Sequence, residues 1–234
     1  MSEAHLAALL DQWGLSTAAL RFVKDKKPQW IVGADEVGYG ALAGPYAVGA
    51  FVCPLEWTRA GVKDSKKFKD RPAREKVYGQ LLTEAGTGFC VHMAGNKRID
   101  NEGKLPVLNG LFERAVMDIV KKMHFELDSA LIILDGHAHI PYPHFPIEGA
   151  DAKIPAVSAA SIMAKVERDW WMERQHEEWP MYGFKAHSGY GTKMHVEAIK
   201  EFGPCEIHRR SYEPIASMLG GAHATVPGRQ DRQR

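Results

Sequence analysis

The sequence predicts an α/β fold in which helices cover a central sheet. The run Leu131–Leu134 is apolar throughout, as in a strand buried on both faces. Segments with a helical spacing of apolar residues alternate with short apolar runs along much of the chain, which is the pattern of an α/β domain. The chain has 234 residues, enough for one sizeable core, so we expect one main domain.

Four short apolar segments are the predicted strands. The first two are residues 30–35 and 46–52, separated by a stretch at 38–45 that is dense in glycine and other turn residues. The third is residues 89–94, and the fourth is the apolar run ending at Leu134. The first two strands are therefore expected to be neighbours in the sheet.

Helices are predicted between and after these strands. Apolar residues fall at helical spacing within 77–82 and 108–119. Residues 156–174 read as one helix rich in alanine and serine, which suits close packing.

The first 28 residues are expected to form a short helical lead-in. Leu6, Leu9, Leu10 and Trp13 share one helical face, and Ser16 is placed to cap a second helix. We expect the main domain to span 29–218 and residues 219–234 to be a disordered basic tail.

Composition and charge exclude few functions. Apolar residues make up 45% and charged residues 25%, as in ordinary soluble proteins, and the net charge is +1. No run of eighteen apolar residues and no signal peptide is visible, so we expect a cytoplasmic protein without membrane contact. The three isolated cysteines are expected to be reduced thiols.

Two predicted strands end on acidic residues that are followed by glycine. Asp35 and Glu36 end the first, shortly before Gly38, and Asp135 ends the fourth, directly before Gly136. Open α/β sheets build their sites at the carboxyl ends of strands. Successive strand residues point to opposite faces, so the first two acids converge only if the strand breaks there, and Gly38 favours such a break.

A further acid, Asp151, comes just before the small-residue helix. Four carboxylates without cysteine favour a hard cation, Mg²⁺ or Mn²⁺, over zinc. Gathered without a cation, these acids would repel one another and raise each other's pKa. An Asp-Gly after a strand is more often a turn than a ligand, so the spacing alone does not establish a metal site.

Six blocks of sequence, taken in order, resemble those of the type 2 ribonucleases H, specifically ribonuclease HII. The block that begins at Asp151 and runs to Asp169 is the most distinctive of them. The blocks are Asp35–Pro45, Lys63–Lys67 with Arg74-Glu75, Asp135-Gly136, Asp151–Asp169, Gly189–His195 and His208–Tyr212.

The resemblance implies a ribonuclease H-like fold, a central mixed sheet with helices on both faces. It implies an endoribonuclease that cuts the RNA strand of RNA–DNA hybrids, with Asp35, Glu36, Asp135 and Asp151 as the catalytic acids that bind two Mg²⁺ or Mn²⁺ ions. Two such ions can activate a water and stabilise the departing 3′ oxygen, leaving 5′-phosphate and 3′-hydroxyl ends.

The resemblance also implies substrate contacts. Gly38, Tyr39 and Gly40 occupy a loop whose backbone contacts the 2′-hydroxyl at the cut, and Tyr190 matches a tyrosine that packs against the sugar beyond it. Remaining expected contacts are Ser65 and three basic residues that would position the duplex through its phosphates, namely Lys66, Lys67 and Arg209.

Three positions depart from the family pattern. Tyr39 stands where ribonuclease HII carries arginine, Val37 where many members carry alanine, and Ser188 where a lysine is usual. The first two make the loop similar to that of ribonuclease HIII, although we expect the 28-residue lead-in to be too short for the extra amino-terminal domain of that subtype. We expect Tyr39 to weaken incision at a single ribonucleotide embedded in DNA.

Other interpretations remain open. A zinc hydrolase would use Asp135 with His137, His139 and His144, and a hybrid-binding module without catalysis would bind the same substrate. Another metal nuclease of the same fold, such as a resolvase, is disfavoured only by the sequence blocks. The expected partners are RNA–DNA hybrids and RNA-containing duplex DNA. We expect a monomer, and the sequence does not identify any protein partner.

Overall fold

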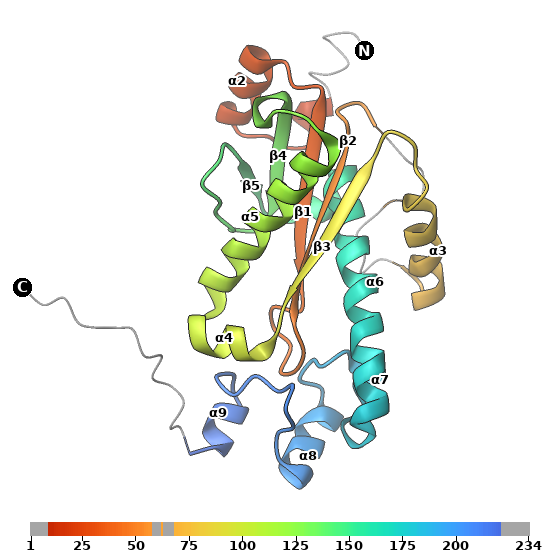
Figure 1. Ribbon diagram of the computed structural model, residues 1–234, viewed down its shortest axis with the longest axis vertical. Coiled ribbons are helices and arrows are strands. Elements are labelled where there is room, and N and C mark those ends of the chain that lie inside the picture. The colour runs from red at the N-terminus through yellow and green to blue at the C-terminus, as the bar shows by residue number, and fades with distance from the viewer. Residues whose placement is uncertain (1–8, 58–61, 63–67, 221–234) are drawn as a thin grey trace, which may run out of the picture. The chain divides into compact units, whose positions relative to one another are not determined.

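The computed structural model describes residues 9–57, 62 and 68–220 (Figure 1). The chain divides into two compact units. Unit 1 takes its described residues from Met1–Val37, Ala47–His92 and Leu108–Glu167. Unit 2 takes its described residues from Gly38–Tyr46, Met93–Val107 and Arg168–Arg234.

A five-stranded mixed sheet, most of it in unit 1, has the strand order β3-β2-β1-β4-β5. Its strands are β1 (Trp30–Val37), β2 (Tyr46–Pro54), β3 (Gly88–Ala94), β4 (Ala130–Asp135) and β5 (Phe145–Ile147). Strand β1 runs antiparallel to β2 and parallel to β4, and β4 runs parallel to β5. The predicted mixed sheet and its four predicted strands are confirmed, whereas β5 was not predicted.

Helices α5 (Lys104–Met123) and α6 (Pro155–Glu178) flank the sheet (Figure 1). Helices α5 and α3 (Arg71–Leu81) confirm the two helices predicted from apolar spacing, and α6 confirms the helix predicted from its alanine and serine content. The remaining helices are α2 (Thr17–Lys26), α4 (Asn96–Glu102), α7 (Phe184–His187), α8 (Lys193–Phe202) and α9 (Ile215–Met218). Single 3-10 turns lie at η2 (Leu127–Ser129), η3 (Ala150–Ala152) and η4 (Pro180–Tyr182).

The lead-in packs on the main core rather than standing apart. The Ser16 hydroxyl accepts a hydrogen bond from the Ala19 amide at 3.2 Å, which confirms the predicted helix cap. Trp13 and Val23 belong to the same buried cluster as Ile31 of β1. Part of the first predicted helix, and the tail from residue 221, lie outside the described residues, so the predicted domain limits stay predictions.

Two glycines let α6 lie directly on the sheet. A Cβ added at Gly33 of β1 would lie less than 3.0 Å from the backbone of Ala156 and Val157. One added at Gly49 of β2 would come as close to the carbonyl of Ala160. No side chain fits between these backbones, so the small residues fix where α6 begins relative to the end of β1.

The described residues contain neither a membrane-spanning helix nor a disulfide bond. Within the described part of the chain, no helix is long and apolar enough to cross a bilayer. The three cysteines are free thiols, as predicted, and Cys53 and Cys205 are buried.

The close approach of α6 to β1 predicts a specific stability defect. Gly33→Ala should lower the free energy of unfolding by about 1–3 kcal/mol, because the new methyl group overpacks the contact. The control is Gly79→Ala, at an exposed site in α3 where an added Cβ meets nothing within 4 Å. It should raise the free energy of unfolding by about 0.5–1 kcal/mol. Urea unfolding of both variants measures the difference, and equal changes would contradict the packing.

Candidate metal centre

The register of β1 and β4 brings two aspartates side by side. The parallel pairing ends with Ala34 opposite Leu134, and Asp35 and Asp135 are the next residues on the two strands. By strand alternation, Asp35 lies on the same face as Gly33, which is the face that α6 covers. The two carboxylates therefore leave the sheet at the same edge and on the helix-covered side.

The segment between β5 and α6 brings in the third carboxylate. Asp151 lies in the single turn η3, whose first residue, Ala150, donates its amide hydrogen to Asp135 Oδ1 at 2.8 Å. At the other end, the Ser158 hydroxyl of α6 donates to the Asp151 carbonyl at 2.6 Å. These two bonds fix the turn between the end of β4 and the first turn of α6.

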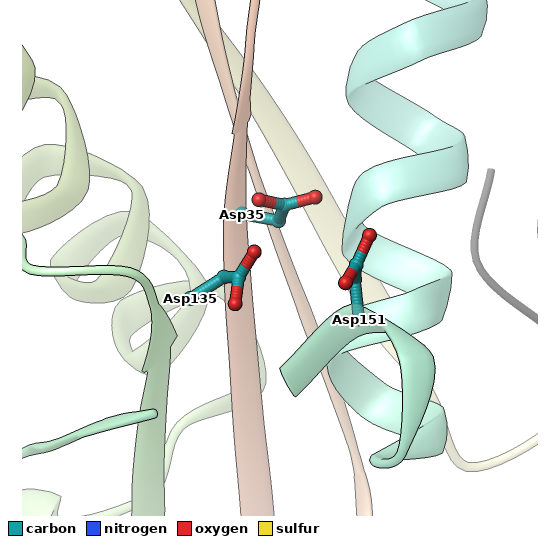
Figure 2. Close-up of side chains that lie close together, drawn as sticks. All are labelled: Asp35, Asp135 and Asp151. Atoms are coloured by element: carbon teal, nitrogen blue, oxygen red, sulfur yellow. The ribbon is translucent and has the colours of Figure 1, made fainter. Parts of the chain in front are cut away.

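Three carboxylates thus meet in unit 1 (Figure 2). One oxygen from each of Asp35, Asp135 and Asp151 lies within 4.8 Å of the others. Asp35 and Asp151 are each 4% exposed, and Asp135 is half-buried. Among the described residues this is the one group of three or more potential metal ligands.

The electrostatics of the cluster favour a bound cation. Burial raises the pKa of Asp35 well above its ordinary value, and the charges of Glu36, Asp135 and Asp151 raise it further, while a hydrogen bond from Ser161 lowers it. Buried carboxylates this close together cannot all stay ionised without a positive charge among them. The donors are oxygens only, so the residues fit a hard divalent cation such as Mg²⁺ or Mn²⁺.

Glu36 does not join this cluster. The expected break in the strand is wrong, because β1 pairs regularly with β2 through Val37, with Glu36 opposite Val48. Successive residues of a regular strand alternate between faces, and Glu36 is not among the residues whose carboxylate oxygens meet within 4.8 Å. Its amide still donates to Asp35 Oδ1 at 2.7 Å, and its charge still acts on the pKa of Asp35.

The glycine loop lies in unit 2. Gly38 has a φ of +91°, and a Cβ there would overlap the Arg168 guanidinium, so only glycine fits. An added Cβ at Gly40 would meet nothing within 4 Å. Tyr39 between them is 37% exposed, and its ring stacks on Tyr46 with the centroids 5.6 Å apart.

Tyr190 lies on a second loop of unit 2 that is tied to the first. The Gly189 carbonyl accepts hydrogen bonds from the amides of Leu42 and Ala43 at 2.8 and 3.2 Å. Tyr190 is 37% exposed, and its backbone carbonyl contacts the His195 imidazole at 2.9 Å. The structure thus places two predicted substrate loops next to each other.

Arg209 does not lie where a phosphate contact requires. Its side chain is 0% exposed, and its guanidinium donates to the carbonyls of Gly44 and Tyr39 at 2.9 and 3.0 Å. The expectation of a phosphate contact does not fit this structure, because the basic run at 207–210 turns this arginine inward. Arg210 beside it is exposed. Ser65, Lys66 and Lys67 lie outside the described residues.

The histidines of the zinc alternative do not form a metal cluster in the described part of the chain. His137 and His139 are exposed. A His144 ring nitrogen instead contacts the Tyr142 carbonyl at 2.7 Å.

Sequence reasoning missed Arg168, which supports the same loops as Arg209. It is 0% exposed and donates to the carbonyls of Ala43, Pro45 and Ser188 at 2.9–3.2 Å. Nothing in the local pattern of a surface-like helix segment indicates an arginine buried among carbonyls that lie far away in sequence.

Comparison with known proteins gives one consistent result. The family model described as Ribonuclease HII matches residues 32–215. Ribonuclease HII of Burkholderia thailandensis is 36% identical over 204 residues, covering 86% of this chain and 91% of the relative. Ribonuclease HII of Coxiella burnetii is 36% identical over 199 residues, covering 84% and 95%.

Solved structures agree on the fold. Ribonuclease H2 from Pyrococcus horikoshii OT3 matches with a TM-score of 0.64 and 25% identity, covering 82% of this chain and 98% of that one. Bst-RNase HIII in complex with Mn²⁺ matches with a TM-score of 0.68 and 18% identity, covering 89% and 74%. The predicted ribonuclease H-like fold is confirmed. With the family model spanning most of the chain, this protein belongs to the ribonuclease HII family and is a ribonuclease H.

Proposed function

We propose that this chain is an endoribonuclease that hydrolyses the RNA strand of RNA–DNA hybrids and incises RNA within duplex DNA, leaving 5′-phosphate and 3′-hydroxyl ends. The observation that carries the proposal is the convergence of three carboxylates within 4.8 Å at the ends of β1 and β4. Family membership supports the substrate class, and the oxygen donors support a divalent cation.

Asp35, Asp135 and Asp151, with Glu36 as the fourth acid, would hold two divalent cations. Bound there, Mg²⁺ or Mn²⁺ supplies activation of a water and stabilisation of the leaving 3′ oxygen. The chain orients these ligands through bonds of its own. The Glu36 amide holds one oxygen of Asp35, and the Ala150 amide holds one oxygen of Asp135. Glu36 lies outside the group of three carboxylates, so its carboxylate must move closer to the other three to act as a ligand.

The loops of unit 2 would distinguish RNA from DNA. Gly40, where an added Cβ would meet nothing within 4 Å, leaves the loop backbone open to close approach by a sugar, and the backbone there can hydrogen-bond a 2′-hydroxyl only if one is present. The exposed ring of Tyr190 is available to pack against the neighbouring sugar.

A second specificity is favoured by Tyr39. An exposed tyrosine stands where the ribonuclease HII loop carries arginine, and the similar loop of ribonuclease HIII also has a residue other than arginine there. A requirement for several consecutive ribonucleotides is therefore the alternative substrate specificity.

Cleavage assays on matched duplexes with Mg²⁺, Mn²⁺, Zn²⁺ or EDTA distinguish the proposed nuclease from a zinc hydrolase and from a hybrid-binding module without catalysis. Zinc-only activity would favour the histidine site, and binding without cleavage would favour a catalytically silent module.

Removing one acid should stop cleavage without stopping binding. Asp35→Asn should lower kcat by at least about 10²-fold, the loss typical of removing one charge-stabilising group from an active site. Affinity for the hybrid should stay within about threefold, because phosphate contacts dominate binding. Asp128→Asn, at an exposed aspartate that pairs with Lys26, is the control and should keep full activity. Loss of binding together with activity in Asp35→Asn would indicate a structural role instead.

The raised pKa of Asp35 predicts how metal-free stability depends on pH. The folded state favours the protonated acid, so the stability contributed by this group is present at low pH. It is lost as pH rises from the ordinary carboxyl range through the raised pKa. In EDTA at pH 7.5, Asp35→Asn should therefore unfold at a higher temperature than wild type, by about 2–4 °C for each kcal/mol of relieved repulsion.

Thermal unfolding across pH, with EDTA and with Mn²⁺, measures this effect. Mn²⁺ should raise the wild-type Tm more at higher pH, because the metal competes with the proton on Asp35. A lower Tm for Asp35→Asn than for wild type in EDTA would show that the carboxylates do not repel one another in the folded protein.

The Tyr39 departure predicts an altered substrate preference. Wild type should cleave a duplex with four consecutive ribonucleotides at least about tenfold faster than one with a single ribonucleotide, and Tyr39→Arg should narrow that ratio. The physical reason is that arginine adds a cation and hydrogen-bond donors to the loop that senses the junction. Initial rates on both duplexes measure the ratio, and identical ratios in the two proteins would refute a role for Tyr39 in junction preference.

A further inference from the structure

Lys104 is an exposed cation held in place by aromatic rings. It is the first residue of α5, and its Nζ lies 3.8 Å from the ring centroid of Tyr212 and 5.8 Å from that of Tyr39. Cation–π contacts of this kind stabilise the position of a lysine at an exposed site. They orient a side chain that would otherwise be flexible while leaving its ammonium open to solvent.

The acids near Lys104 in unit 2 are engaged elsewhere. Asp100 accepts hydrogen bonds from the amides of Arg210 and Ser211, both at 3.0 Å. Glu102 pairs with Arg98 at 2.9 Å. Across the described residues, no carboxylate forms an ion pair with Lys104. Its charge is therefore uncompensated within the protein.

Further positive charge gathers around the same ring. The buried Arg209 guanidinium has its Cζ 5.1 Å from the Tyr212 centroid, and the bonds it donates go to backbone carbonyls. The first turn of α5 contains no acidic residue, so the positive end of that helix also lies beside Lys104. Like charges collected without a counter-charge are costly, and an anionic ligand would offset that cost.

Beside this cation lies a rigid, exposed aromatic surface. Tyr39 is 37% exposed, and its ring stacks on the ring of Tyr46 with an angle of 20° between the ring planes. The backbone carbonyl of Tyr39 accepts hydrogen bonds from Arg209 Nη1 and Tyr212 Oη, each at 3.0 Å. An aromatic face next to an unpaired cation is the combination that proteins use to hold a nucleic-acid strand.

We infer that Lys104 binds a backbone phosphate of the nucleic-acid substrate, with the ring of Tyr39 packed against the adjoining nucleotide. The inference rests on the proposed function and adds a specific residue to it. Residues 38–40 hold no cation of their own, so Lys104 supplies the charge beside that loop. The contact positions the duplex and does not take part in bond breaking.

Three variants test the assignment. Lys104→Gln removes the charge, Lys104→Arg keeps it, and Lys97→Gln removes a lysine of the same unit that is already paired with Glu206 at 3.0 Å. Affinity for a labelled RNA–DNA hybrid is measured in EDTA, where no cleavage occurs, over a series of KCl concentrations. Steady-state KM and kcat are measured in Mg²⁺.

Lys104→Gln should weaken binding about 3–10-fold and raise KM similarly, with kcat unchanged within twofold. The slope of log affinity against log salt should fall by about 0.9, the value for one lost phosphate contact. Lys104→Arg should restore affinity and slope, and Lys97→Gln should change both little. Equal effects of the two Gln variants, or an unchanged slope in Lys104→Gln, would overturn the assignment. Absence of cleavage by wild type would count against the proposed function, while binding in EDTA would still decide for or against Lys104.

Discussion

The crowding of three carboxylates at the ends of β1 and β4 is the constraint on which the rest of unit 1 depends. Holding Asp35, Asp135 and Asp151 within 4.8 Å of one another, with two of them nearly inaccessible to water, is unfavourable for the protein alone, as the raised pKa of Asp35 shows. The fold nevertheless enforces the arrangement. Glycines in β1 and β2 seat α6 against the sheet, and the Ala150 amide ties the turn that carries Asp151 to the end of β4. Such a site is organised for a cation before any cation arrives.

Unit 2 is organised by buried cations in place of carboxylates. Arg168 and Arg209 are both fully buried, and their guanidinium groups bond to carbonyls of residues 39–45 and of Ser188. Guanidinium donors in a fixed fork suit this use, because one side chain can hold several strands of backbone at once. The glycine loop and the Tyr190 loop therefore keep a defined shape, while their positive surroundings suit a polyanionic substrate.

The sequence predicted what depends on local pattern. Apolar runs bounded by glycine indicated β1, β2 and β4, and the acids that follow two of these runs indicated two of the three clustered residues, Asp35 and Asp135. Strand β5 was not predicted, because Phe145–Ile147 is short and contains Pro146. The regular pairing of β1 through Val37 was not predicted, because Gly38 favoured a break in the strand that does not occur. Arg209 was predicted to be a basic surface residue, because the carbonyls that accept its hydrogen bonds lie about 165–170 positions earlier in the chain. Contacts of that range cannot be read from local pattern.

The most direct test of the central claim is to locate the metal. Crystals grown with Mn²⁺ should show anomalous density at distances of about 2.1 Å from oxygens of Asp35, Asp135 and Asp151, with Glu36 turned toward the second of two ions. Anomalous density elsewhere, or none at saturating Mn²⁺ with the three carboxylates still in contact, would contradict a metal-dependent site at the ends of β1 and β4.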